Sequence, residues 1–408
     1  MKRFLIKRQK LLKHNSRKII MNKNHDAFNN KNIKVPFVVP NITSTDKKTI
    51  QKALSSKLLT DGPNVRNFEK NFSKFTKSKF SIGVSNATAA LQLSLRAIGV
   101  TRNDEVIIPD ITFVATANSV LYCNATPVLA DVDKDDFNIS ADSIEENISK
   151  RTKAIIPVHF AGKSCNMKKI MKIAKKYNLK IIEDCAHGLG TYYEGKHVGN
   201  FGETGCFSFY PTKNLTTFEG GMIISSSRKT ADYVKKGRNH GISKSLKDRF
   251  TKGLPWDYDV SELGYNFRLD EIRSALGINQ LTRLDKMNYL RRIAALYYHS
   301  KLKDIEGIFV PTIENSKSNS WHLYVIKILD DFKLSRNELF KKLLQKGIRT
   351  SVHYKPLHLF KLYKKSTKTY SNLKNSSHVY EQMLSLPMFP TISKNELSIV
   401  TDSINSYR

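Results

Sequence analysis

Acidic residues are scarce in this chain of 408 residues. Asp and Glu number 36 against 68 Lys and Arg, so the formal net charge is +32 at pH 7. A basic surplus usually indicates nucleic acid, membrane surfaces or anionic substrates as partners. Here the surplus is spread along the chain rather than gathered into one block, which is typical of a solvated basic surface. We therefore expect no nucleic-acid partner, whereas an anionic small-molecule substrate would suit the charge.

Long apolar runs are also missing. The most apolar stretch, residues 106–130, is interrupted by Asp110, Asn118 and Asn124. A membrane-spanning helix needs about 20 predominantly apolar residues, so we expect no membrane span. Hydrophobic residues make up 40% and charged residues 25% of the chain, which is the composition of an ordinary soluble protein.

The N-terminal segment contains no Asp or Glu before residue 26. Its apolar run, residues 4–6, is too short for the core of a secretory signal, and mitochondrial presequences are richer in Arg and Ser. We expect residues 1–33 to form a basic, disordered extension, with Met21 as a candidate true start. With no export signal, the expected location is the cytoplasm.

Cysteine is rare, and the few cysteines are not spaced as pairs. No Cys-x-x-Cys motif occurs, which excludes a zinc knuckle or a disulfide framework on the usual patterns. We therefore expect reduced thiols and no metal site. The four residues are Cys123, Cys165, Cys185 and Cys206.

Apolar runs of strand length recur from residue 80 onward, and several have helical stretches between them. Residues 166–178 are the clearest helix, with Asn166 as N-cap. The residues predicted on its apolar face are Met167, Ile170, Met171, Ala174 and Tyr177. This alternation predicts an α/β fold with a mostly parallel sheet covered on both faces. The seven predicted strands are residues 80–84, 105–109, 126–132, 153–160, 180–185, 205–210 and 221–226.

After about residue 285 the pattern changes to helices with a single clear strand. Residues 286–304 and 335–345 have helical patterning, and residues 321–329 are strand-like. We predict a large domain over residues 34–285 and a smaller α+β domain over residues 286–408.

Asp184 and Lys213 are the residues that most directly indicate a catalytic site. Asp184 lies at the end of one predicted strand and Lys213 follows the next, and ligands of such sheets bind beyond the carboxyl ends of the strands. Alone, each is more often a solvated charge on a loop. Together they match a pyridoxal-phosphate site, in which a lysine holds the cofactor as a Schiff base and a carboxylate keeps its ring nitrogen protonated.

Other polar and aromatic residues fit the same site. Residues 85–93 (SNATAALQL) join a strand to a helix whose free N–H groups could bind phosphate, with hydroxyl groups added by Thr88 and Ser208. Phe113 could stack on the cofactor ring, although an aromatic there is more often core. His187 could bond the phenolic oxygen of the cofactor, although it is more often structural.

Two later segments also carry polar residues of interest. Arg268, in GYNFRLDEIRSALG (264–277), could pair with a carboxylate or phosphate, against the alternative of a surface ion pair. SVHYKPLH (351–358) offers His353, Tyr354 and His358, any of which could be packing residues.

These segments together resemble the DegT/DnrJ/EryC1/StrS family of sugar-nucleotide aminotransferases. The matching pieces run in order over residues 35–285, and the likeness continues weakly to the C-terminus. They are LTDGP (59–63), SNATAALQL, DEVIIPDITFVATANSV, IIPVHFAG, IIEDCAHGLGTYYEG, CFSFYPTKNLTT-EGG and GYNFRLDEIRSALG.

The resemblance implies an aspartate-aminotransferase-like fold and a homodimer with active sites at the interface. It implies that Lys213 is the Schiff-base lysine and Asp184 the pyridinium partner. The implied cofactor-binding set is Ala87, Thr88, Phe113, Asp184, His187, Ser208, Lys213 and, from the partner subunit, Asn266. The positions implied near the substrate are Thr60, Arg268, His353 and Tyr354.

Three positions depart from the common family pattern. Ala87-Thr88 stands where many members have Gly-Thr, and His187 stands where many have Gln. Both variants resemble the branch that aminates a UDP-linked 4-keto-pentose. Phe218 stands where Gly usually precedes Glu-Gly-Gly, which could reshape the loop after Lys213.

The expected function is transfer of an amino group from glutamate to a nucleotide-linked keto sugar, most readily a 4-keto sugar, in surface glycan or polysaccharide biosynthesis. One alternative keeps the fold and changes the chemistry, as in a dehydratase or an aminotransferase for a non-nucleotide substrate. A basic protein that binds nucleic acid or lipid is the other alternative, and the dispersed charge argues against it.

Overall fold

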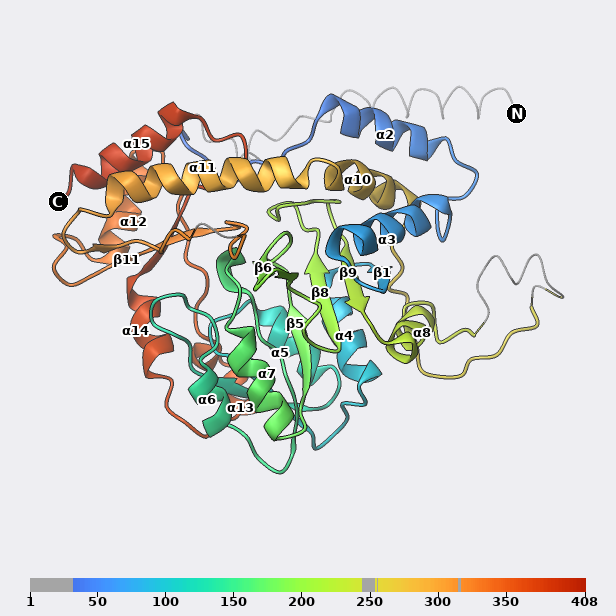
Figure 1. The fold of residues 1–408 in the computed structure, drawn as a ribbon. Helices are drawn as coiled ribbons and strands as arrows, with labels where there is room; N and C mark the ends of the chain where they lie inside the picture. Colours follow the sequence, from blue (N-terminus) through green and yellow to red (C-terminus); the bar gives the residue numbers. More distant parts are fainter. Residues whose placement is uncertain (1–31, 244–253, 255, 315–316) are drawn as a thin grey trace, which may run out of the picture.

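The structure is a computed structural model that describes residues 32–243, 254, 256–314 and 317–408 (Figure 1). Nearly all of the predicted extension, residues 1–33, therefore lies outside the described residues. Within the described part, no helix is both long enough and apolar enough to cross a lipid bilayer. The four cysteines are buried and free, as the sequence predicts.

A seven-stranded sheet forms the centre of the molecule, in the order β1-β9-β8-β5-β4-β2-β3. Strand β9 is antiparallel to both neighbours, and the remaining pairs are parallel, so the predicted mostly parallel sheet is confirmed. The strands are β1 (Phe80–Val84), β2 (Glu105–Pro109), β3 (Thr126–Ala130), β4 (Thr152–Ile155), β5 (Lys180–Asp184), β8 (Thr204–Ser208) and β9 (Gly221–Ser225).

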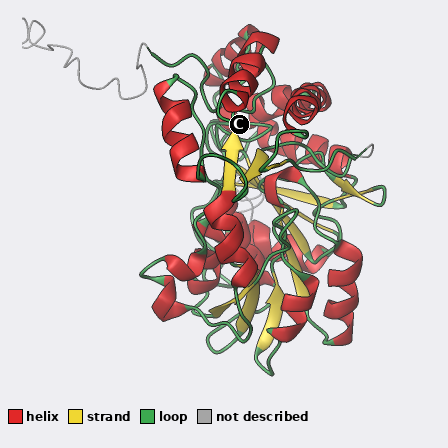
Figure 2. Cartoon of the chain, turned by 90° about the vertical axis from the view of Figure 1, so that its left-hand side faces the viewer, coloured by secondary structure: helices red, strands yellow, loops and turns green. Residues whose placement is uncertain are grey.

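Helices cover both faces of this sheet because successive side chains of each strand point to opposite sides. On β8, Cys206 packs in the core beneath α4, whereas Phe207 packs on the other face with Phe68 and Phe72 of α3. Figure 2 shows the strands between helical layers. One layer holds α4 (Ala87–Ala97), α5 (Val114–Leu121) and α8 (Arg228–Gly237), and the other holds α3 (Pro63–Thr76), α6 (Ala141–Glu146) and α7 (Met167–Lys176).

Helix α7 begins as predicted, because the Asn166 side chain accepts a hydrogen bond from the Lys169 N–H at 3.1 Å. Its predicted apolar face was partly wrong. Met171 and Tyr177 are exposed, at 37% and 38%, whereas Ile173 is buried. The buried stripe needs only about 100° of the helix surface, and Ile173 completes it beside Ile170.

A second, three-stranded antiparallel sheet lies in the C-terminal part, in the order β10-β11-β12. Helices α10 and α11 lie end to end across the top of the molecule and lead into this part (Figure 1). Val35 pairs with Ile348, so the start of the described chain packs on the same core. The division at residue 285 stays a prediction.

The remaining elements complete the description. The small sheet consists of β10 (Ile308–Phe309), β11 (Tyr324–Ile328) and β12 (Met383–Leu386). A separate two-stranded hairpin is formed by β6 (Tyr192–Tyr193) and β7 (Lys196–His197). The other helices are α2 (Ser44–Leu54), α10 (Glu271–Leu281), α11 (Leu284–Leu302), α12 (Arg336–Gln345), α13 (Tyr363–Ser366), α14 (Lys374–Gln382) and α15 (Lys394–Asn405). Short 3-10 turns span Phe160–Gly162 and Leu357–Leu359.

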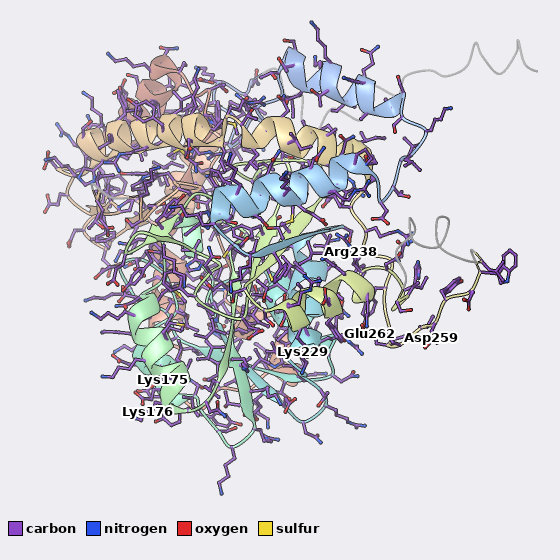
Figure 3. All side chains as sticks on the ribbon, turned by 45° about the vertical axis from the view of Figure 1, so that its right-hand side comes forward. Lys175, Lys176, Lys229, Arg238, Asp259 and Glu262 are labelled. Carbon is purple, nitrogen blue, oxygen red and sulfur yellow. The ribbon has the colours of Figure 1, made fainter. Side chains whose placement is uncertain are left out.

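Basic side chains are distributed over the surface, as the sequence predicts. Lys175 and Lys176 on α7 lie far from Lys229 on α8, and all three are exposed (Figure 3). The described surface therefore carries its positive charge on several elements at once.

Glu271, at the start of α10, caps helix α3 from a distance. Its carboxylate is buried and accepts hydrogen bonds from the N–H groups of Gly62, Asn64 and Val65 at 2.8–3.0 Å. Gly62 is the N-cap residue of α3 and has no side chain to satisfy these groups. A Cβ on Gly62 would lie 2.6 Å from the Glu271 carboxyl carbon, so this close approach requires glycine.

We expect Glu271→Gln to lower the free energy of unfolding by about 2 kcal/mol, because an amide nitrogen would face one of the three N–H donors. Chemical denaturation measures the change. The matched control is Glu146→Gln at an exposed position on α6, for which a change under about 0.5 kcal/mol is expected. Equal stabilities for the two variants would contradict the capping role.

Candidate active site

The carboxyl ends of β5 and β8 bring the two principal residues to one edge of the sheet. Asp184 is the last residue of β5 and lies opposite Cys206 of β8. Strand β8 ends at Ser208, and Lys213 follows in a turn. The Lys213 N–H donates a hydrogen bond to the Tyr210 carbonyl at 2.9 Å. The predicted placement of both residues beyond adjacent strand ends is what the structure shows.

Asp184 is almost fully buried, with 5% of its surface exposed. Its carboxylate accepts hydrogen bonds from the Thr116 hydroxyl at 3.0 Å and from the Ala186 N–H at 3.1 Å. Burial raises the pKa of the Asp184 carboxyl, while these two bonds and the charge of Lys213 oppose the rise. A cation placed next to this carboxylate would therefore be strongly favoured.

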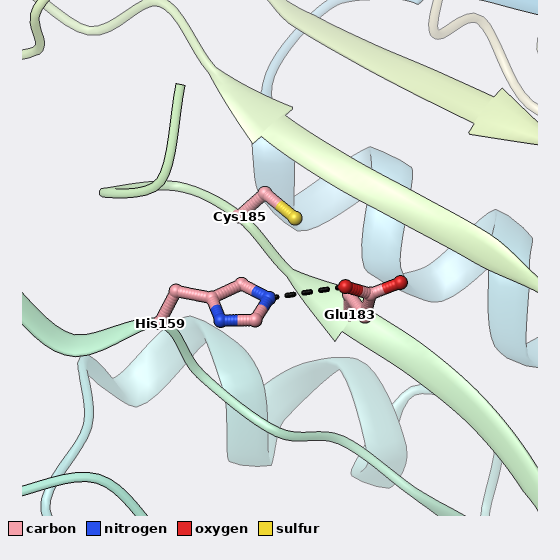
Figure 4. A group of neighbouring side chains, drawn as sticks. All are labelled: His159, Glu183 and Cys185. Carbon is pink, nitrogen blue, oxygen red and sulfur yellow. Dashed lines mark hydrogen bonds and ion pairs between the residues drawn. The ribbon is translucent and has the colours of Figure 1, made fainter. Parts of the chain in front are cut away.

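Glu183 and His159 fix the strand end on which Asp184 lies. The His159 Nε2 is 3.1 Å from the Glu183 carboxylate, and both side chains are fully buried (Figure 4). The His159 Nδ1 accepts the Cys165 N–H at 3.1 Å, so the proton lies on Nε2 and points to Glu183. The Glu183 carboxylate also accepts three backbone N–H groups of the following loop, those of Gly199, Phe201 and Gly202.

This cluster has the residue types of a metal site, with Cys185 as a third neighbour. The acceptor atoms of Glu183 and His159 are, however, already engaged by N–H donors. Burial also raises the pKa of the Cys185 thiol well above its usual value. The cluster is therefore a structural hydrogen-bond network that holds β5 and the loop after it.

Lys213 makes no side-chain hydrogen bond or ion pair with another described residue. Burial lowers the pKa of its amine to about 8, and the Asp184 carboxylate opposes that change. The charge of Lys213 in turn contributes to lowering the pKa values of His187 and His353. These residues therefore share one pocket.

His187 and Tyr354 are joined by a hydrogen bond in that pocket. The Tyr354 hydroxyl lies 3.1 Å from the His187 Nε2, whereas the buried His187 Nδ1 has no partner among the described residues. Burial holds the pKa of His187 well below its ordinary value, so the ring is neutral. Phe113 lies 5.8 Å from the Tyr354 ring and is 56% exposed, so its own face is open to a ligand.

The predicted phosphate-binding residues lie around the N-terminus of α4. This helix starts at Ala87 and Thr88, and both are only partly buried. Ser208 pairs with Gly221, and a Cβ on Gly221 would lie 2.9 Å from the Ala87 nitrogen. Ser208 and the free N–H groups of α4 are thus brought to the same place, where the helix terminus favours an anion.

Residues that the sequence reasoning missed connect Lys213 to the C-terminal part. Asn214 donates to the Ser320 carbonyl at 2.9 Å, and its side-chain oxygen lies 3.2 Å from the His322 Nδ1. Ser320 donates to the His187 carbonyl at 2.9 Å, and the His322 and His187 rings are 4.3 Å apart. Of these residues, only Asn214 could have been noticed from the sequence, because it directly follows Lys213.

Three of the predicted substrate or cofactor residues lie elsewhere on this chain. Thr60 pairs with Asp270, and Asn266 pairs with Asn239. Arg268 donates to the Asn239 side chain at 2.7 Å and lines a separate cavity of about 580 Å³ alongside α8. Thr60 and Asn266 are exposed, and among the described residues none of the three contacts Lys213 or Asp184.

His353 is placed at the pocket through the small sheet. Its Nδ1 lies 2.9 Å from the Ser385 hydroxyl, and its ring stacks on Phe37 at 5.4 Å. Burial lowers the pKa of His353 to about 4, with Lys213 adding to the effect. His353 is therefore neutral at physiological pH.

Phe218 keeps the backbone conformation that a glycine would adopt at its position. Its φ is +66°, and its N–H bonds the Thr216 hydroxyl at 3.0 Å. A left-handed conformation costs a residue with a side chain about 1–2 kcal/mol. The Phe218 ring is 46% exposed, so the departure from the family pattern adds a ring to the surface and leaves a glycine-like turn.

Comparison with known proteins gives the family of this chain. The model of the DegT/DnrJ/EryC1/StrS aminotransferase family matches residues 40–405. The chain belongs to this family. The spore coat polysaccharide biosynthesis protein SpsC of Bacillus subtilis is 36% identical over 91% of this chain and 96% of its own length.

Solved structures agree with this assignment. Helicobacter pylori PseC, an aminotransferase involved in the biosynthesis of pseudoaminic acid, is 33% identical with a TM-score of 0.84, over 91% of this chain and 98% of PseC. The pyridoxal-phosphate form of the sugar aminotransferase Spr1654 from Streptococcus pneumoniae is 28% identical with a TM-score of 0.84, over 91% of this chain and 98% of its own. The predicted aspartate-aminotransferase-like fold of this family member is thereby confirmed.

The burial of Lys213 predicts that its amine titrates near pH 8 in the cofactor-free protein. Asp184→Asn should lower this pKa further, because the carboxylate charge stabilises the ammonium form. Competitive labelling with acetic anhydride at a series of pH values, read by peptide mass spectrometry, measures both. Exposed Lys229 in the same digest is the labelling reference, and identical titration of Lys213 and Lys229 would contradict the burial argument.

Proposed function

We propose that this family member is a pyridoxal-phosphate-dependent aminotransferase that converts a nucleotide-linked 4-keto sugar to an amino sugar, with glutamate as donor. The observation that carries the proposal is the placement of buried Asp184 near Lys213, whose amine makes no hydrogen bond or ion pair with a described residue, at one edge of the sheet. The names of SpsC and PseC support sugar chemistry in polysaccharide and glycan biosynthesis. We propose a cytoplasmic location on the same basis.

The residues present fit pyridoxal phosphate. Ala87, Thr88 and Ser208 would hold the phosphate at the N-terminus of α4, and the open face of Phe113 would take the ring. Lys213 would bind the cofactor covalently through Nζ, which has no other described partner. When bound, the cofactor supplies an electron sink that stabilises negative charge at the carbon that loses a proton.

Asp184 would keep a ring nitrogen protonated. Its carboxylate is held by Thr116 and Ala186 and reinforced from behind by the Glu183–His159 network. A positive N–H next to it gives the carboxylate the counter-charge that offsets its burial. The geometry of the strand end therefore determines which atom of the ligand stays charged.

Lys213 would act as the base and acid once its amine is free. A pKa of about 8 leaves a useful fraction of the amine neutral near physiological pH, and general catalysis works best when the pKa is near the working pH. Nζ would take the proton from the α-carbon of the amino donor and return it to the neighbouring position. The same atom would serve the second half of a ping-pong cycle.

Tyr354 would act as a positioning residue through His187. If its hydroxyl donates to Nε2, the proton of the neutral His187 ring lies on Nδ1, which has no described partner. That N–H would be available to a phenolic oxygen, as expected for a residue in this position. His353 would line the substrate side of the same pocket.

We propose a homodimer in which Asn266, with Thr60 and Arg268, serves the partner's site. Each of the three lies away from Lys213 in its own chain, and Thr60 and Asn266 are exposed. Large apolar side chains are exposed in the chain segments that precede Thr60 and Asn266, and exposed apolar side chains are typical of an interface. They are Leu54, Leu58, Leu59, Trp256 and Leu263.

Lys213→Ala should abolish amination of a nucleotide-linked keto sugar, with a loss of at least about 10³-fold, because both covalent binding and proton transfer depend on one amine. The assay is product detection by mass spectrometry with a panel of keto-sugar nucleotides and simple keto acids. Lys229→Ala, at an exposed position on α8, should keep wild-type activity. An active Lys213→Ala protein would overturn the mechanism.

Co-expression of Lys213→Ala with Asn266→Ala tests the shared site. If each site combines Lys213 of one subunit with Asn266 of the other, random pairing restores about a quarter of wild-type activity, although each variant alone is impaired. The matched control is Lys213→Ala with Asp184→Ala, which both damage the site of their own chain and should give no recovery. Equal results for the two mixtures would refute sharing.

A further inference from the structure

The amine of Lys213 has no hydrogen-bond partner among the described residues, so its position is set by the surrounding packing and by the turn that carries it. The Lys213 N–H bonds the Tyr210 carbonyl at 2.9 Å, and the Thr217 N–H bonds the Phe209 carbonyl at 2.9 Å. These two bonds hold the turn against the end of β8. Asn214 lies between them in sequence, and its side chain turns to other parts of the chain.

Asn214 is buried and uses its whole side-chain amide. Its nitrogen donates to the Asn288 side-chain oxygen at 2.8 Å and to the Ser320 carbonyl at 2.9 Å. An amide nitrogen carries two hydrogens, so both are used. The Asn214 oxygen is the remaining acceptor, and it lies 3.2 Å from the His322 Nδ1. The amide is a rigid junction, because breaking any of these bonds leaves a polar group desolvated.

The same junction determines where His322 carries its proton. The Asn214 oxygen can only accept, so the His322 Nδ1 must be the donor. Burial holds the pKa of His322 well below its ordinary value, and the charge of Lys213 adds to the effect. The ring is therefore neutral, with its single N–H on the side of Asn214.

Both side-chain partners of Asn214 are held by helix α11. Asn288 lies on this helix. Arg291, three residues further along, donates to the His322 carbonyl at 3.2 Å. The turn that carries Lys213 is therefore tied to α11 and to the segment before β11, in addition to the strand from which it leaves.

We propose that Asn214 is a positioning residue that holds the amine of Lys213 where it can transfer a proton. The proposal rests on the proposed function, in which Nζ of Lys213 is the base and acid. A displacement of about 1 Å can lower a rate by about 10²-fold. A residue that acts only through the backbone of its neighbour can therefore control the proton transfer.

The first test measures the pKa of Lys213 in the full-length, cofactor-free protein by acetic anhydride labelling over a range of pH. Asn214→Ala should loosen the turn and let water reach the amine. Because water stabilises the ammonium form, the pKa of Lys213 should rise toward its ordinary value by at least about half a pH unit.

The matched control is Asn147→Ala. Asn147 is also buried, and its nitrogen likewise donates to two oxygens, those of the Ser143 carbonyl and the Ser371 hydroxyl, at 2.8 and 2.7 Å. The control removes the same kind of amide and should lower the thermal stability to a similar degree. It should leave the pKa of Lys213 unchanged, because Asn147 has no bond to the turn.

His322 provides a second pair of variants and a rescue. In His322→Asn the amide N–H replaces the Nδ1–H, so the bond to Asn214 is kept, whereas His322→Leu removes it. We expect His322→Leu to raise the pKa of Lys213 as Asn214→Ala does, and His322→Asn to retain the wild-type value. If Asn214→Ala does not fold, this pair decides, and equal titrations in the two variants would overturn the proposal.

The cofactor-loaded enzyme gives an independent measurement. Asn214→Ala should lower kcat for amination by at least about tenfold and change KM by less than about twofold, because proton transfer is impaired and substrate binding is not. A wild-type titration of Lys213 in Asn214→Ala, or an equal shift in Asn147→Ala, would overturn the proposal. The expected shifts in a protein whose wild type aminates no keto sugar would support positioning by Asn214 and defeat the proposed function.

Discussion

The buried carboxylate of Asp184 is the constraint on which the rest of the site depends. A carboxylate in this environment needs donors on every side, and the chain supplies them from distant segments. Thr116 comes from α5, Ala186 from the following loop, and the Glu183–His159 network fixes the strand from behind. The sheet order puts β8 next to β5, so the turn that carries Lys213 must pass beside this carboxylate.

Part of this arrangement could be predicted from the sequence because its signals are local. Apolar runs marked the seven strands; Asp184 lies at the end of one of them, and Lys213 lies in the turn after the next. The exact strand ends were less accurate, since the run 153–160 is a strand only to Ile155 and is interrupted by Pro157, which has no N–H to donate. Met171 was wrongly placed in the core, because helical periodicity does not show which apolar residues lie at the edge of the buried face.

The contacts that complete the pocket could not be predicted in this way. Asn214 meets His322 across 108 positions, and His187 meets Tyr354 across 167. Such pairs depend on how the small sheet packs against the large one, which no local pattern encodes. Family resemblance located His353 and Tyr354 near the substrate but gave no reason for it, and the hydrogen bond to His187 supplies one for Tyr354.

Two desolvated cations, fully buried Arg291 and half-buried Lys213, show how structural and reactive roles differ physically. Arg291 on α11 is buried without a carboxylate partner in the described part of the chain, and burial lowers its pKa to about 9. Its guanidinium is nevertheless held by the carbonyls of Trp321, His322 and Met388 at 3.0–3.4 Å. It joins the helix to the segment that carries His322 and leads into β11, and so supports the wall of the pocket.

Lys213 is also desolvated, yet its amine has no such carbonyl cradle among the described residues. A desolvated ammonium without a hydrogen-bond partner costs free energy that packing elsewhere must offset. Fold stability alone would favour an apolar side chain at this position. The cost is understandable if the amine is reserved for a ligand. Carbonyl acceptors would hold the amine in its protonated form, and it could then neither act as a nucleophile nor accept a proton. The absence of a partner at Lys213, beside the held carboxylate of Asp184, is therefore the strongest physical sign that this pair is reactive rather than structural.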